Sequence, residues 1–211
     1  MMHSSALLRL AAVGAAALSL SACVSLLPKT KPAHLYRFGQ PVAAGAVDAA
    51  VGSVGVFRTS ATFQRESAGD RLLTITDGKA AYVAETRWVA PAAVLWDEAV
   101  VSAFDADPGH VRLIARGEPA TAPYVLRLDV RNFEAQYDQG PKAPPLVVDR
   151  VRAAMTSTTD RGLVGEKLFE KRVRAADNRV TAIVPAYDRA VGELLAEVVA
   201  WTNANAKATT S

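Results

Sequence analysis

The single cysteine of this chain is the feature that most constrains how it can fold. Cys23 is the only cysteine among 211 residues, so no intramolecular disulfide can hold the structure together. An apolar stretch at residues 10–20 follows a short, weakly positive segment, which is the pattern of a secretory signal. Hydrophobic residues make up 50% of the chain and charged residues 21%, as in an ordinary folded protein. An exported chain of this kind must be stabilised by its own hydrophobic core.

The residues Leu20-Ser21-Ala22-Cys23 close the apolar stretch. They resemble the lipobox of bacterial lipoproteins, in which Leu and two small residues precede the cysteine. The small side chains let an intramembrane peptidase bind extended backbone, and the thiol accepts diacylglycerol before cleavage. We therefore predict that residues 1–22 are a signal peptide and that Cys23 carries a covalent lipid. No other cofactor is expected.

An uncleaved transmembrane helix over residues 10–27 is the alternative, since that length is near the lower limit for a span. The Ala and Gly content, the single flanking positive charge and Pro28 disfavour it. Position 24 is Val, whereas Asp there retains a lipoprotein in the inner membrane under the enteric sorting pattern. We therefore predict an outer-membrane protein, anchored by lipid and facing the periplasm.

The mature chain divides into a tether and one domain. Residues 24–34 contain two prolines and two lysines without apolar periodicity, which is typical of an extended linker. We predict a lipidated N-terminus and tether at 23–34, a single domain at 35–201 and a disordered tail at 202–211. The net charge of +3 is small and the basic residues are dispersed, which argues against nucleic acid as a partner.

The apolar periodicity predicts several strands and two principal helices. The strands are expected at 35–38, 51–57, 72–76, 80–84, 111–115, 124–133, 147–157 and 163–173, and the helices at 94–104 and 182–201. Asp77-Gly78 and Asp160-Arg161-Gly162 are expected to close hairpins. The predicted fold class is α/β (α+β by element order), as a single domain with a mixed, mostly antiparallel sheet and two principal helices.

The sequence offers no catalytic or metal-binding constellation. His110 follows a turn, and Asp97-Glu98 are neighbours on a predicted helix whose side chains should point apart. We expect a protein that is not an enzyme and holds no metal. Arg87 and Trp88 lie at the end of a strand before a helix and are candidate partner-binding residues. The alternative is that Trp88 packs in the core beneath that helix.

Several features follow one another along the chain: the lipobox at Leu20 to Cys23, the Leu35-Tyr36 strand, Arg87-Trp88 with Pro91, the 124–133 strand, the Asp160-Arg161-Gly162 hairpin and a last helix ending at Trp201. Their order and spacing resemble the ABC-type transport auxiliary lipoprotein family, which includes the paraquat-inducible protein C type. The resemblance implies a three-layer fold like that of the anticodon-binding domain. It also implies an accessory role beside an ABC lipid transporter and a periplasmic MCE-domain partner, and it carries no catalytic residue.

A regulator of cell-wall synthesis enzymes is the second reading of the same pattern. Such lipoproteins tend to have long disordered linkers, whereas the tether here spans only about 35–40 Å when extended. The short tether favours a partner that itself reaches the outer membrane, as in a system that moves phospholipid or another hydrophobic compound between the two membranes. The sequence leaves open whether the chain forms homo-oligomers.

Overall fold

Strand β7 (Tyr124–Gln136) organises the fold, because it pairs with four other strands of the described chain. The computed structural model describes residues 32–39, 53–107 and 109–207, and its elements all belong to the compact unit Ala33–Ser211. In the nine-stranded sheet, β7 lies between β4 (Arg71–Thr76) and β2 (Val54–Arg58). It also pairs with β3 (Thr62–Phe63) and β8 (Leu146–Ser157).

The remaining strands extend the sheet from this centre. They are β1 (His34–Tyr36), β5 (Lys79–Trp88), β6 (Val111–Ile114) and β9 (Leu163–Arg174). The principal order is β1-β5-β4-β7-β2-β6, and β8 joins β9 to β7. The two predicted hairpins are confirmed as β4–β5 and β8–β9. Asp77 and Gly78 turn the first with φ angles of 48° and 74°, the left-handed conformation that such turns require.

The prediction of a mostly antiparallel sheet was wrong. Five of the eight strand pairings in the described chain are parallel, namely β1–β5, β2–β6, β2–β7, β3–β7 and β4–β7. The antiparallel pairings, β4–β5, β7–β8 and β8–β9, join strands that follow one another in the chain. Turn residues reveal those neighbours, but parallel strands need long crossovers that leave no local signal.

Among the described residues, three helices accompany the sheet: α2 (Arg65–Ala68), α3 (Ala92–Asp105) and α4 (Val180–Asn205). Pro91 occupies the N-cap of α3, so the helix begins two residues before its predicted start at residue 94. α4 is longer than predicted, so residues 202–205 belong to the helix and not to a disordered tail. Their polar side chains are satisfied there: Thr202 donates to the carbonyl of Val198, and Asn205 donates to that of Trp201.

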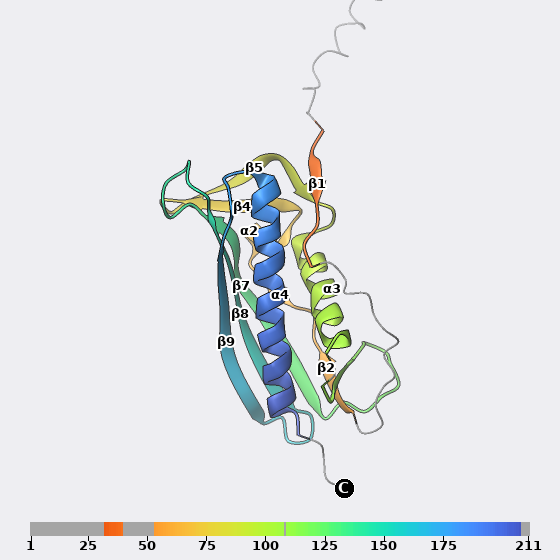
Figure 1. Ribbon diagram of the computed structural model, residues 1–211. Coiled ribbons are helices and arrows are strands. Elements are labelled where there is room, and N and C mark those ends of the chain that lie inside the picture. Colours follow the sequence, from red (N-terminus) through yellow and green to blue (C-terminus); the bar gives the residue numbers. More distant parts are fainter. Residues whose placement is uncertain (1–31, 40–52, 108, 208–211) are drawn as a thin grey trace, which may run out of the picture. The chain divides into compact units, whose positions relative to one another are not determined.

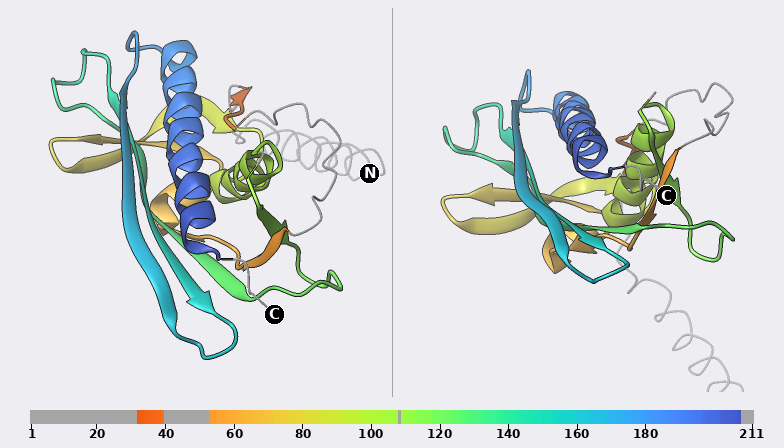
Figure 2. Two further views of the ribbon diagram at one scale, coloured as in Figure 1. Left: turned by 60° about the horizontal axis from the view of Figure 1, so that its bottom comes forward. Right: turned by 90° about the horizontal axis from the view of Figure 1, so that it is seen from below.

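The two long helices form one layer on one face of the sheet (Figures 1 and 2). α4 packs against β8, β9 and α3. Trp96 of α3 reaches the same face of β8, where its indole NH lies 3.3 Å from a carboxylate oxygen of Asp149. The two long helices thus cover one face of the sheet, and the short helix α2 packs against β4, β7 and α3.

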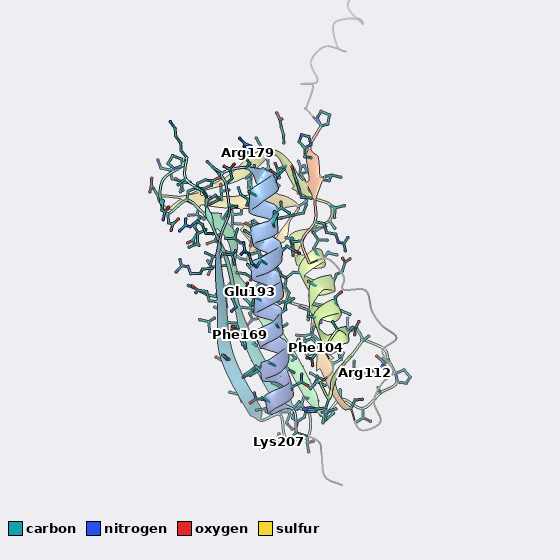
Figure 3. All side chains as sticks on the ribbon, in the orientation of Figure 1. Phe104, Arg112, Phe169, Arg179, Glu193 and Lys207 are labelled. Atoms are coloured by element: carbon teal, nitrogen blue, oxygen red, sulfur yellow. The ribbon has the colours of Figure 1, made fainter. Side chains whose placement is uncertain are left out.

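An aromatic cluster fills the space between the layers. The ring of Phe133 on β7 lies 5.0 Å from Phe38, 4.9 Å from Tyr187 and 5.8 Å from Phe63, measured between centroids. Figure 3 shows Phe104 and Phe169 on opposite sides of α4, with Glu193 on its outward surface. The apolar residues of α4 form a continuous stripe that is buried against the core, and Leu194 is 0% exposed.

Candidate partner-binding surface

The two predicted partner-binding residues lie in different environments. Trp88, at the end of β5, is only 3% exposed, and its ring lies 4.9 Å from Phe38 and 5.2 Å from Tyr187. Arg87 is exposed and donates a 2.7 Å hydrogen bond to Asp70. Adjacent residues of a strand point to opposite faces, which explains the difference. Trp88 is therefore a core residue, and only the side chain of Arg87 is available to a partner.

Arg87 lies within a small surface at the edge of the sheet. β1 pairs in parallel with β5 and places Leu35 beside Arg87, and the amide of Val89 donates to the carbonyl of Tyr36. Leu35 is 63% exposed and Val89 is 51% exposed. We call Leu35, Arg87 and Val89 the β1 edge. Exposed aliphatic groups around a guanidinium suit contact with another protein.

A groove runs between the two long helices. It has a volume of about 390 Å³ and is lined largely by small and aliphatic side chains, including Ala99, Ala103, Gly192 and Val199. Gly39 lies in its wall, and its amide donates a 2.8 Å hydrogen bond to Asp188. A Cβ atom at position 39 would lie 2.6 Å from that of Ala99, and the φ angle of +65° favours glycine. The groove offers apolar contacts with a carboxylate in its wall.

The acidic pair at the middle of α3 has a structural role. Asp97 accepts a 2.6 Å hydrogen bond from Arg58 of β2. Glu98 accepts a 2.5 Å hydrogen bond from Arg37, which follows β1. The two carboxylates therefore point toward different partners, as their adjacency on a helix predicts. They connect α3 to β2 and to the segment that follows β1.

The residues after α3 are also tied into the fold. Asp107 accepts hydrogen bonds from the amide of Gly109 and from the side chain of Asn203, at 2.9 and 2.8 Å. His110 is exposed, and its Nε2 atom lies 2.7 Å from the carbonyl oxygen of Ala206. Across the described chain, no three His, Cys, Asp or Glu side chains are grouped so that they could hold a metal ion.

Asp149 is a buried acid that the sequence reasoning missed. Its carboxyl is 0% exposed, one of its oxygens has no hydrogen-bond partner, and the other accepts from the Trp96 indole. Burial raises the pKa of this carboxyl to about 7, an effect that the Trp96 hydrogen bond only partly opposes. The available signal was its place between Val147 and Val151, which puts Asp149 on the inward face of β8.

Cys23 lies outside the described residues, as do most of the predicted tether and the apolar stretch before it. In the part of the chain that the structure covers, no helix has the length and apolar character needed to span a membrane. The predicted lipidation stays a prediction at this point.

The described residues thus form a small α/β domain with an exposed sheet edge at β1 and a groove between its two long helices. Residues 69–199 match the model of the ABC-type transport auxiliary lipoprotein component family. The chain belongs to this family and is an auxiliary lipoprotein component of an ABC-type transport system. The family resemblance noted from the sequence is therefore confirmed.

Solved structures show the same fold. A protein from Xanthomonas campestris matches with a TM-score of 0.67 at 22% identity, over 82% of this chain and 96% of that one. A hypothetical protein from Chlamydia trachomatis matches with a TM-score of 0.50 at 11% identity, over 72% of this chain and 99% of that one. The comparison with curated proteins gave no match. At these identities the likeness concerns the fold alone.

Proposed function

We propose that this lipoprotein is the non-catalytic accessory component of an ABC transporter that moves lipid between the inner and outer membranes with a periplasmic MCE-domain protein. The observation that carries the proposal is the family match over residues 69–199, joined to the lipobox and short tether at the N-terminus. The protein acts by binding. The β1 edge, through Arg87, contacts the MCE-domain partner.

The anchor is the first element of the proposal that can be tested. Mass spectrometry of the mature protein should find a diacylglyceryl group on Cys23, because that thiol ends a lipobox. Cys23→Ser should leave the protein without its lipid anchor, so that it is either released from the membrane fraction or stranded there with residues 1–22 uncleaved. Two acyl chains suffice for stable attachment, so the wild-type protein should be found almost wholly in the membrane fraction with those residues removed. In the wild-type protein, an unmodified thiol or retention of residues 1–22 would contradict this part of the proposal.

A single substitution can test whether the lipoprotein lies in the inner or the outer membrane. Val24→Asp places the inner-membrane retention signal of enteric bacteria directly after the lipidated cysteine. In such a host, the wild-type protein should fractionate with the outer membrane and Val24→Asp with the inner membrane. Inner-membrane fractionation of both proteins would overturn the outer-membrane assignment.

The partner is tested by isolating the tagged, full-length chain from membranes and identifying the proteins that accompany it. Recovery of the MCE-domain protein is expected, and Arg87→Glu should reduce it roughly tenfold, because the substitution reverses the charge of the β1 edge. Arg116→Glu is the matched control: Arg116 is exposed and follows β6, at the other end of the principal strand order from β1.

The outcomes of this isolation separate the competing functions. Recovery of a peptidoglycan synthase in place of the MCE-domain protein would replace the transport proposal with the cell-wall one. Equal recovery by Arg87→Glu and the wild-type protein would remove the β1 edge from the proposal and leave the partner in place.

A further inference from the structure

Four arginines lie on the face of strands β7 to β9 that the long helices leave uncovered. Figure 2 shows that the two long helices lie on the other face of these strands. The face comprises Arg127 and Arg131 of β7, Arg150 and Arg152 of β8, and Glu166 and Leu168 of β9. We call this set the arginine face. The strand register brings its members together, since Arg152 pairs with both Asp129 and Leu168 across the ladder. Residues paired in this way share one face of a sheet.

Three of the four arginines already have acidic partners on the same face. Arg127 donates a 2.8 Å hydrogen bond to Asp129, and Arg152 donates one of 2.8 Å to Glu166. Arg150 is paired with Glu170. These pairs neutralise one another, so they leave little charge for a ligand.

Arg131 is different. Its exposed guanidinium forms no hydrogen bond or ion pair with any residue that the structure describes. Its charge still acts at longer range: the pKa of Glu166 is lowered first by the Arg152 hydrogen bond and further by the charges of Arg127 and Arg131. Among the described residues, Arg131 is therefore the arginine of this face that has no direct acidic partner.

The backbone places Arg131 at a specific point on this face. The β7–β8 register shifts between Val130 and Asn132, which face Val151 and Arg150, so Arg131 is the extra residue of a bulge. Bulges redirect a side chain out of the regular alternation and occur often beside functional sites. Two hollows meet at Arg131, with volumes of about 520 and 540 Å³.

The walls of the hollows define what fits beside Arg131. One hollow is bounded by Thr62, Phe63 and Gln64, and the other by Leu168, whose side chain is 57% exposed. Aliphatic and aromatic surface thus flanks the free guanidinium. A guanidinium binds a planar carboxylate through two parallel hydrogen bonds. A ligand with one carboxylate and apolar neighbours matches both the charge and the walls.

We propose that the arginine face docks an acidic segment of a protein partner, with one Asp or Glu carboxylate on Arg131 and an apolar side chain against Leu168. The charge balance favours a carboxylate over a phosphate-rich surface. Asp129, Glu166 and Glu170 surround the site, and a multiply charged ligand would bring further negative charge beside them. This surface is separate from the β1 edge and does not depend on the MCE assignment.

Photo-crosslinking in cells tests the proposal with the full chain. Leu168 is replaced by p-benzoylphenylalanine, and the crosslinked peptides are identified by mass spectrometry. A protein adduct is expected whose crosslinked peptide contains Asp or Glu. Arg131→Glu should reduce its yield roughly tenfold, and reversal of that acidic residue to Arg in the partner should restore the yield. Arg189→Glu is the control, because Arg189 is exposed on α4 in the opposite layer and should leave the yield unchanged.

Each other outcome overturns the proposal in a defined way. A crosslink to lipid would assign the face to the membrane surface. In that case the unanchored Cys23→Ser protein should float with phosphatidylglycerol vesicles, and adding Arg131→Glu should abolish the flotation. A crosslink to a second copy of this chain would assign it to self-association. The absence of any adduct, or an adduct that Arg131→Glu leaves unchanged, would remove the site. None of these results bears on recovery of the MCE-domain protein through Arg87.

Discussion

The free energy of unfolding of the wild-type protein is expected to fall between pH 5 and pH 8, and replacing Asp149 with Asn should abolish most of this fall. The carboxyl of Asp149 has a raised pKa of about 7 because it is buried, against 3.8 for an ordinary aspartate. Between these two values the folded state keeps a proton that the unfolded state has released. The free energy of unfolding therefore falls as the pH rises through this window, and it levels off above the folded pKa.

The size of the effect follows from the same two values. Each unit of difference in pKa corresponds to about 1.4 kcal/mol, and the part that lies between pH 5 and pH 8 amounts to about 2–3 kcal/mol. Asn keeps a side-chain oxygen for the Trp96 indole NH but cannot ionise. Urea unfolding at the two pH values should show this difference for the wild-type protein relative to Asp149→Asn.

Asp138→Asn is the matched control for this experiment. Asp138 is exposed, and its pKa is lowered chiefly by a hydrogen bond from Arg174. Its contribution to stability is present above the ordinary aspartate pKa and is lost only as the pH falls below it. The Asp138→Asn profile should therefore parallel that of the wild-type protein between pH 5 and pH 8. Equal profiles for Asp149→Asn and the wild-type protein would mean that Asp149 ionises in the core without cost.

The parts of this fold that the sequence predicts are those encoded by neighbouring residues. The turn Asp77-Gly78 identified the β4–β5 hairpin, and the turn at residues 160–162 identified β8–β9. The continuous apolar stripe identified α4, although its last turn is polar in composition. Local periodicity and turn residues therefore predict which elements exist, even where the end of an element differs from the prediction, as it does for α4.

The pairing of strands that are distant in sequence, the shortest elements and the bulge in β7 could not be predicted in this way. The parallel pairing of β2 with β7 joins Phe57 to Val125, and nothing near either residue specifies the other. β3 and α2 are too short to show a period. The arginine face was visible only in part: the alternation of β7 placed Arg127 and Arg131 on its outer side, but the bulge that isolates Arg131 depends on the register with β8.

Trp88→Ala is expected to lower the free energy of unfolding by about 3–5 kcal/mol, the range for removing a large aromatic side chain from a core. The Trp88 ring contacts Phe38 and Tyr187 at 4.9 and 5.2 Å between centroids, so truncation leaves a cavity between rings from the segment after β1 and from α4. Arg87→Ala breaks only an exposed ion pair with Asp70 and should change stability by less than about 1 kcal/mol. Chemical denaturation of both variants measures the contrast.

This contrast decides how a loss of partner binding must be interpreted at the β1 edge. If Trp88→Ala unfolds part of the protein at the temperature of the isolation, less of the partner will be recovered because less of the domain is folded. Such a loss would not show that Trp88 contacts the partner. Arg87→Glu changes the same short segment from its exposed side, where Leu35 and Val89 also lie, and it leaves the aromatic cluster intact. A stability loss in Trp88→Ala as small as that in Arg87→Ala would contradict the buried position of Trp88 and return its ring to the binding surface.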